Sequence, residues 1–171
     1  MIPRIQFLLL LAALALPAWL SAQGVDSSKI DQVLGRSGEK AGEVYKVTFP
    51  RSDLHVLVHG LSIKPGLALG SWAAFSSSDD DARVMGDLVL LGDEVGPVMA
   101  KLRASGFDIT GIHNHLLGES PRVMYMHYMG HGKAADLAGS LTSALAMSKT
   151  PLGKPAASAK SETEPDRKSV V

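Results

Sequence analysis

Residues 107–129 read F-D-I-T-G-I-H-N-H-L-L-G-E-S-P-R-V-M-Y-M-H-Y-M and contain two segments rich in β-branched or aromatic residues, joined by a polar turn. This composition is typical of two consecutive β-strands. We therefore expect residues 107–115 and 123–129 to pair as strands, with L-L-G-E-S-P-R as the turn between them. Four of the six histidines of the chain lie in this strand pair or directly after it. The stretch therefore carries most of the ligand chemistry of the sequence.

The segments on both sides of this pair predict four more strands and three helices. The strand-like segments are 44–49, 54–59, 66–75 and 83–91. The segments with apolar residues at helical spacing are 28–34, 93–106 and 133–147. The order α-β-β-β-β-α-β-β-α predicts an α+β fold, in which helices pack on one face of a mainly antiparallel sheet. We expect 44–49 and 54–59 to form a hairpin or meander, and the step from 83 to 115 to be a crossover that places two strands parallel.

The two ends of the chain have the composition of segments outside a folded domain. Residues 1–22 begin with one cation, Arg4, continue with an apolar run from Ile5 to Leu16, and end in small residues, which is the layout of a secretory signal peptide. Residues 151–171 are rich in Pro, Ser, Ala and mixed charge, which predicts a disordered tail. We expect signal cleavage, export to the periplasm or the medium, and a single domain over residues 26–150; a retained N-terminal anchor is the alternative.

Charge and cysteine content exclude several classes of partner and chemistry. Loss of Arg4 with the signal reduces the 17 basic residues to 16, against 17 acidic ones. Such a balance provides no electrostatic field to attract nucleic acid or an anionic membrane, so we expect neither as a partner. The chain has no cysteine, which excludes disulfides, a lipid-modified N-terminal cysteine and thiol chemistry.

Two of the histidines have the spacing of metal ligands. Side chains two residues apart on a strand point to the same side, so His113 and His115 can converge on one ion from Cα atoms about 7 Å apart. Glu119, in the turn, can swing back to complete two-His-one-carboxylate ligation, and His127 on the returning strand can add a third imidazole. We therefore expect a site for zinc or another divalent transition metal. The simplest chemistry of such a site is hydrolysis by a metal-bound water, with a carboxylate as the base.

Two other interpretations of this stretch stay open. In the first, the protein is a non-catalytic binding or accessory module of the cell envelope, whose histidines and Arg122 bind a small anionic ligand without turnover. Asn114, Tyr125 and His131 are further candidate ligand-binding residues in this interpretation. In the second, the histidines are structural and each forms hydrogen bonds with its neighbours. The sequence does not choose between an enzyme and a binding module.

The methionines of the second strand raise the question of copper, because thioethers and imidazoles are both copper ligands. Strand alternation places Met124 and Met126 on the side opposite His127. We therefore expect these methionines to fill the core beneath the helices rather than to bind a metal.

Three stretches together resemble the LppY/LpqO family, a domain of unknown function in exported bacterial proteins. They are G-L-A-L-G-S-W-A-A-F (66–75), V-M-G-D-L-V-L-L-G-D-E-V-G-P-V-M (84–99) and I-H-N-H-L-L-G-E-S-P-R-V-M-Y-M-H (112–127). The resemblance covers most of residues 28–150. Some members of that family are lipoproteins and some carry the domain twice, whereas this chain has no cysteine and one copy. Membrane tethering is therefore not implied, and a single copy can pair instead as a homodimer, which size-exclusion chromatography with light scattering would test.

Overall fold

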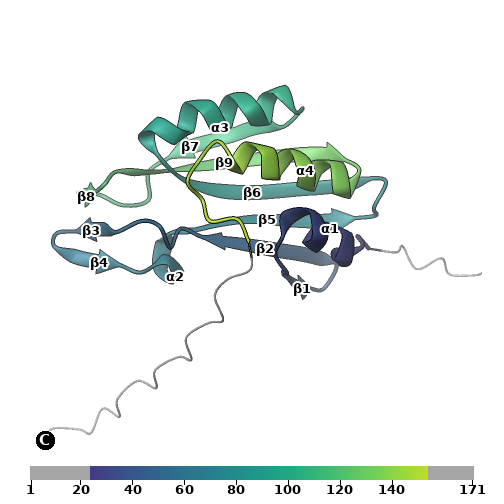
Figure 1. The fold of residues 1–171 in the computed structure, drawn as a ribbon, viewed down its shortest axis with the longest axis horizontal. Helices are drawn as coiled ribbons and strands as arrows, with labels where there is room; N and C mark the ends of the chain where they lie inside the picture. The colour runs from purple at the N-terminus through teal and green to yellow at the C-terminus, as the bar shows by residue number, and fades with distance from the viewer. Residues whose placement is uncertain (1–23, 154–171) are drawn as a thin grey trace, which may run out of the picture.

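The computed structural model describes residues 24–153, which fold around a six-stranded antiparallel sheet (Figure 1). From one edge to the other, its strands are β1 (Glu39–Ala41), β2 (Val44–Pro50), β5 (Gly70–Ser77), β6 (Ala82–Leu91), β9 (Val123–Gly132) and β7 (Asp108–His113). Every neighbouring pair in this order is antiparallel. The predicted signal peptide (1–22) and residues 154–171 of the predicted tail lie outside the described residues.

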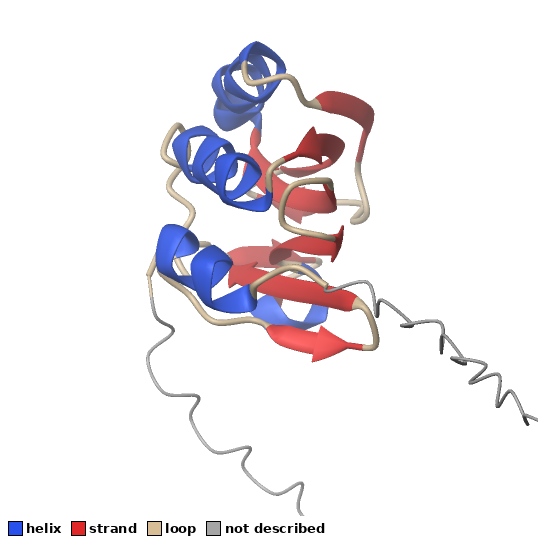
Figure 2. Cartoon of the chain, turned by 90° about the vertical axis from the view of Figure 1, so that its right-hand side faces the viewer, coloured by secondary structure: helices blue, strands red, loops and turns tan. Residues whose placement is uncertain are grey.

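Three helices cover one face of this sheet (Figure 2). They are α1 (Ser27–Leu34), α3 (Gly92–Ala104) and α4 (Ala134–Leu145). In β2, Tyr45, Val47 and Phe49 are buried beneath the helices, whereas Lys46 and Thr48 point to the other face and are exposed. Burial of each large apolar side chain in this core contributes about 1.5–3 kcal/mol. The arrangement confirms the predicted α+β fold, and no helix within residues 24–153 is long and apolar enough to cross a bilayer.

A second, smaller sheet lies against part of the other face, which we call the open face. Its strands, in order, are β4 (Leu61–Ile63), β3 (Val56–Val58) and β8 (Glu119–Ser120), and the short helix α2 (Pro65–Ala68) follows β4. Six apolar side chains from these segments and from the large sheet form a second buried cluster: Leu54, Val56, Leu69, Val89, Val123 and Tyr125. Met85 and Met129, further along the open face, are exposed. The open face is therefore covered at one end and accessible at the other.

Gly86, in β6, makes room for an aromatic ring within the sheet. A Cβ atom at this position would clash with the ring of Tyr128 and with the carbonyl oxygen of Trp72. The Tyr128 hydroxyl donates a hydrogen bond to that same carbonyl, at 3.2 Å. The absence of a side chain at Gly86 thus fixes how closely β6, β9 and β5 approach one another beside Asp87 and His127.

A buried ion cluster ties the end of β2 to α3 and to the C-terminal segment. The side chain of Arg51 is fully buried and directs its five N–H groups to Glu94, Asp53 and a backbone carbonyl of β6, at 2.6–3.1 Å. Glu94 also accepts hydrogen bonds from the backbone N–H groups of Leu91 and Lys149. Burial alone would raise the pKa of Glu94, but these bonds and the charge of Arg51 lower it overall.

One predicted strand pairing and one predicted strand boundary are wrong. Segment 54–59 does not pair with β2, because the chain turns out of the large sheet at Pro50 and the anchored Arg51, and β3 joins the small sheet instead. Residues 65–68 form a helix rather than the start of a strand, since Pro65 has the φ that the first helical position requires. The crossover expected between 83 and 115 is present: β6 and β7 run in the same direction, with β9 between them.

Candidate functional site

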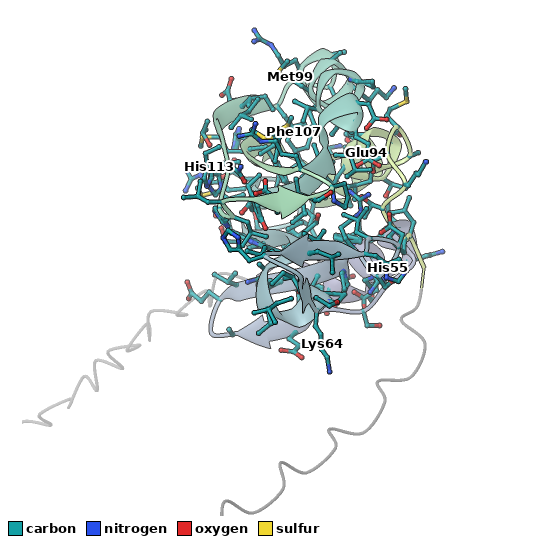
Figure 3. The ribbon with its side chains drawn as sticks, turned by 90° about the vertical axis from the view of Figure 1, so that its left-hand side faces the viewer. His55, Lys64, Glu94, Met99, Phe107 and His113 are labelled. Atoms are coloured by element: carbon teal, nitrogen blue, oxygen red, sulfur yellow. The ribbon has the colours of Figure 1, made fainter. Side chains whose placement is uncertain are left out.

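Three histidines and one aspartate meet on the open face, where β6, β9 and β7 lie next to one another. The register pairs Asp87 with His127 and His113 with Tyr125. His115 follows directly after the end of β7. His113 lies at the surface on the side away from α4 (Figure 3). We refer to His113, His115 and His127 as the imidazole cluster.

The ring of His113 contacts both other rings of the imidazole cluster. The Nε2 atoms of His113 and His115 are 2.7 Å apart, and the ring of His127 stacks on that of His113 with centroids 4.8 Å apart. The ring of His115 in turn stacks on Tyr125 at 3.7 Å, and the Tyr125 hydroxyl donates to the carbonyl oxygen of Ala68. Two imidazole nitrogens at 2.7 Å must share one proton or face one cation, because two lone pairs or two N–H groups would repel. The two rings therefore form one N–H···N hydrogen bond, in which either ring can be the donor.

Asp87 places a buried carboxylate beside the imidazole cluster. Asp87 is 6% exposed, and its Oδ1 atom accepts no hydrogen bond from any described residue. Nδ1 of His127 lies 3.8 Å from this oxygen, which is too long for a hydrogen bond. Burial raises the pKa of Asp87, and the opposing effects of the three histidines and of the backbone N–H of Leu88 do not cancel this rise. Since an unpaired buried carboxylate destabilises a fold, Asp87 is the strongest indication of function on this face.

A cleft of about 330 Å³ adjoins the cluster. Its walls come from β2 and β5, from α2 and from the site itself: Thr48, Pro50, Pro65, Gly66, Leu67, Ala68, Gly70, Trp72, Asp87, His115 and Tyr125. The indole of Trp72 is partly exposed, and the ammonium group of Lys46 lies 4.5 Å from its centroid. Asp87 and His115 belong both to the cleft and to the histidine site, so a molecule in the cleft lies next to the imidazoles.

The predicted ligand Glu119 has other partners than the imidazoles. Its carboxylate accepts a hydrogen bond from the side-chain amide of Asn114 at 2.9 Å and lies 4.0 Å from Nε of Arg122. Burial alone would raise the pKa of Glu119, but backbone N–H groups, Asn114 and Arg122 lower it overall. The structure thus brings these three predicted residues together as a loop contact. The carboxylate beside the imidazoles is that of Asp87.

His131 and most of the methionines also lie apart from the cluster. His131 is exposed and its Nε2 atom is 2.6 Å from a carboxylate oxygen of Asp81. Met126 is fully buried beneath the helices, as expected, and Met124 is partly buried. Met129 differs from both, because it follows His127 by two residues on β9 and so shares the open face with it.

No complete metal site is preformed within residues 24–153: no group of three or more His, Cys, Asp or Glu side chains there has an arrangement that could hold an ion. The imidazole cluster presents two converged nitrogens, and the ring of His127 stacks on that of His113. A third ligand therefore requires the side chain of His127 to rotate.

The described domain matches a known protein family. The family model described as Domain of Unknown Function (DUF1259) covers residues 28–147. The chain belongs to this family. No curated protein and no solved structure matches the sequence. The match confirms the expected domain of unknown function, whereas the resemblance of this DUF1259 domain to the LppY/LpqO family stays a prediction.

Asp87 is the residue of the DUF1259 domain that the sequence interpretation missed. It is the only charged residue in the stretch V-M-G-D-L-V-L-L, which is otherwise apolar apart from one glycine. An isolated acidic residue in an apolar strand is the signal that would have identified it. Buried carboxylates without a partner are rare and are concentrated at functional sites. Its position beside His127 could not be derived, since the sequence does not reveal that β9 pairs with β6.

Proposed function

We propose that this DUF1259 domain binds a divalent transition metal such as Zn²⁺ through His113, His115 and His127, and that the site hydrolyses a small molecule held in the adjoining cleft. The observation that carries the proposal is the 2.7 Å separation between Nε2 of His113 and Nε2 of His115. An ion can replace the shared proton once the two nitrogens move apart to about 3.3 Å, the separation of two imidazole nitrogens that bind one tetrahedral zinc at about 2.0–2.1 Å. Three imidazoles with an open fourth position are a recurrent ligand set of catalytic zinc.

Asp87 supports the third ligand in this proposal. Histidines that bind a metal usually donate their second ring N–H to a carboxylate, which fixes the ring orientation. Oδ1 of Asp87 lies 3.8 Å from Nδ1 of His127 and has no other partner among the described residues. A rotation of the ring that closes this distance leaves Nε2 of His127 free for the ion. The negative charge of Asp87 then offsets part of the charge of the metal.

The cleft provides the place for a substrate. Its lining includes His115 and Asp87, so a molecule bound there meets the open side of the imidazole cluster. A bound divalent ion supplies an activated water and polarises a carbonyl or phosphoryl oxygen. Tyr125, stacked on His115 and hydrogen-bonded to Ala68, holds the imidazole in position beside the cleft.

Metal analysis of untagged protein tests the proposal. After incubation with zinc and removal of free ions, we expect about one equivalent per chain in the wild type, as for a single three-histidine site. The double substitution H113A/H115A should abolish this binding, whereas His131→Ala, which removes an exposed imidazole outside the cluster, should retain it. Unchanged zinc content in the double variant would refute the metal site.

A non-catalytic binding module is the second candidate function. It is favoured by a buried arginine, Arg36, that has no carboxylate partner within the described residues and lines a cavity next to the cleft. A panel of ester and phosphoester substrates separates the two functions. Metal-dependent turnover that disappears in H113A/H115A supports the enzyme, and zinc binding without turnover of any substrate supports the module.

We also propose that the protein is exported. The proposal is supported by the layout of residues 1–22, in which one cation precedes an apolar run and small residues. N-terminal sequencing of the protein recovered from an expressing bacterium should give a chain that starts at Gln23. An N-terminus that still contains the apolar run would indicate the retained anchor instead.

A further inference from the structure

Arg36 is a buried cation whose charge is not paired within residues 24–153. It is 5% exposed, and its Nε atom is buried without a hydrogen-bond partner. Its contacts are one hydrogen bond from Nη2 to the carbonyl oxygen of Pro151, at 3.3 Å, and the ring of Phe49, 5.5 Å from the guanidinium carbon. The uncompensated burial lowers the pKa of Arg36. Arg51, the other buried arginine, has acceptors for all of its N–H groups, so Arg36 has capacity for an anion that Arg51 lacks.

Arg36 lines a cavity of about 260 Å³ at the edge of the large sheet. β1 pairs with β2 only as far as Lys46, so the following part of β2 forms a free edge there. The cavity is lined by this edge and by the segment that connects α1 to β1: Arg36, Ser37, Gly38, Glu39, Lys46, Thr48 and Pro50. Two of these side chains are cations, and Glu39 is the one carboxylate among the lining residues. The lining thus favours an anion, with Glu39 opposing it.

This cavity adjoins the cleft at the imidazole cluster. Thr48 and Pro50 line both, and Lys46, which lines the first, contacts the ring of Trp72, which lines the second. Lys46, Thr48 and Pro50 alternate onto the open face of β2, and Thr48 and Trp72 are direct neighbours across β2 and β5. A ligand that spans this shared wall would extend from the Arg36 cavity toward His115.

We propose that Arg36 and Lys46 bind an oxyanion group, a carboxylate or a phosphate, of a ligand whose remaining part lies in the cleft beside the imidazole cluster. The guanidinium forms two parallel hydrogen bonds with such groups, which gives both affinity and orientation. The evidence for the anion site is the unpaired, buried Arg36, and it does not depend on the metal. The placement of the rest of the ligand beside the imidazole cluster rests on the proposed function. The substrate class is then a small organic acid or phosphate ester.

Isothermal titration calorimetry on metal-free protein, with inorganic phosphate and with succinate as probes at constant ionic strength, tests the anion site. We expect Arg36→Lys and Lys46→Gln each to weaken binding by about tenfold, which corresponds to the loss of one charge-assisted contact. Glu39→Gln should strengthen binding because it removes the opposing charge. Lys40→Gln, a substitution on the opposite side of β1, is the matched control and should leave binding unchanged.

The variants keep the proposal open to refutation even if Arg36 also has a structural role. Lys46 and Glu39 are exposed, so their substitutions should not disturb folding. Equal affinity in wild type, K46Q and E39Q would overturn the anion site. Preference for phosphate or for succinate identifies which oxyanion class the site takes. Binding that survives in H113A/H115A supports the anion site even if no metal is found, whereas binding lost only in that variant would place the anion on the histidines and refute the proposal.

Discussion

Glu94 and Asp87 are two carboxylates with the same 6% exposure, yet their hydrogen bonding and the direction of their pKa shifts are opposite. Glu94 accepts hydrogen bonds from Arg51 and from two backbone N–H groups, and its pKa is lowered. Asp87 has an oxygen without a partner among the described residues, and its pKa is raised. The first carboxylate stabilises the fold, because its charge is fully compensated. The second destabilises it and lies among histidines at a cleft, which is where uncompensated charge is useful for binding.

The largest effect expected from this comparison is that of Glu94→Gln. The substitution keeps the shape of the side chain but removes the charge that compensates Arg51, so the free energy of unfolding should fall by about 3 kcal/mol. Urea denaturation followed by circular dichroism measures this change. A loss well below about 1 kcal/mol would show that Asp53 alone compensates the arginine, and that the two buried carboxylates differ less than their contacts indicate.

Acid should reduce the same stabilisation more gradually. Because the pKa of Glu94 in the folded protein lies below its ordinary value of 4.5, the unfolded chain takes up the proton first as the pH falls. The contribution of Glu94 is therefore complete above 4.5 and is lost as the pH falls through its folded pKa. Urea denaturation at a series of pH values should show the difference between wild type and E94Q shrinking in this range. A constant difference would contradict the lowered pKa.

The matching substitution Asp87→Asn should have a smaller effect of opposite sign. In metal-free protein it removes an uncompensated buried charge, so stability should rise by up to about 1 kcal/mol. Zinc affinity should fall by about tenfold or more, because the orienting partner of His127 is weakened. Denaturation and zinc titration of the same preparation measure both. A destabilisation like that of E94Q would show that Asp87 is a structural residue with a partner such as a bound water.

The smallest effect is expected for Arg122→Gln. The side chain of Arg122 is 75% exposed and lies 4.0 Å from Glu119, so its loss should change the free energy of unfolding by less than about 0.5 kcal/mol. Zinc content should also be unchanged, because the Asn114–Glu119 contact remains. Loss of zinc in this variant would mean that the Glu119 loop contributes to the site, as the spacing of the sequence suggested.

The features that the sequence predicted well are those that depend on neighbours along the chain. The strand pair around residues 107–129 and the three long helices follow from alternation, helical spacing and turn chemistry, which are local. The convergence of His113 and His115 also follows from their spacing, although His115 lies just beyond the strand. Short elements such as β1, β4 and β8 span two or three residues and leave no periodic signal.

The remaining features depend on contacts between distant segments. Asp87 joins the histidines only because β6 lies next to β9, and β9 lies next to β7. Glu119 has the spacing of a ligand, but the direction of a turn side chain is set by hydrogen bonds within its own loop, here with Asn114. Arg36 belongs to no sequence motif. It is identified only because its buried Nε atom has no hydrogen-bond partner among the described residues.

The position of Trp72 gives the protein a built-in optical reporter. The chain has two tryptophans, and the other, Trp19, lies within the predicted signal peptide, so the mature form would contain Trp72 alone. Its indole lines the cleft and carries the Lys46 ammonium group over its ring, at the junction between the histidine site and the Arg36 cavity. A ligand that enters the cleft contacts this ring, and a ligand that binds Lys46 in the Arg36 cavity changes the position of the ammonium group over it. Its emission spectrum can therefore be used to screen candidate ligands on unlabelled protein, before any reaction is known.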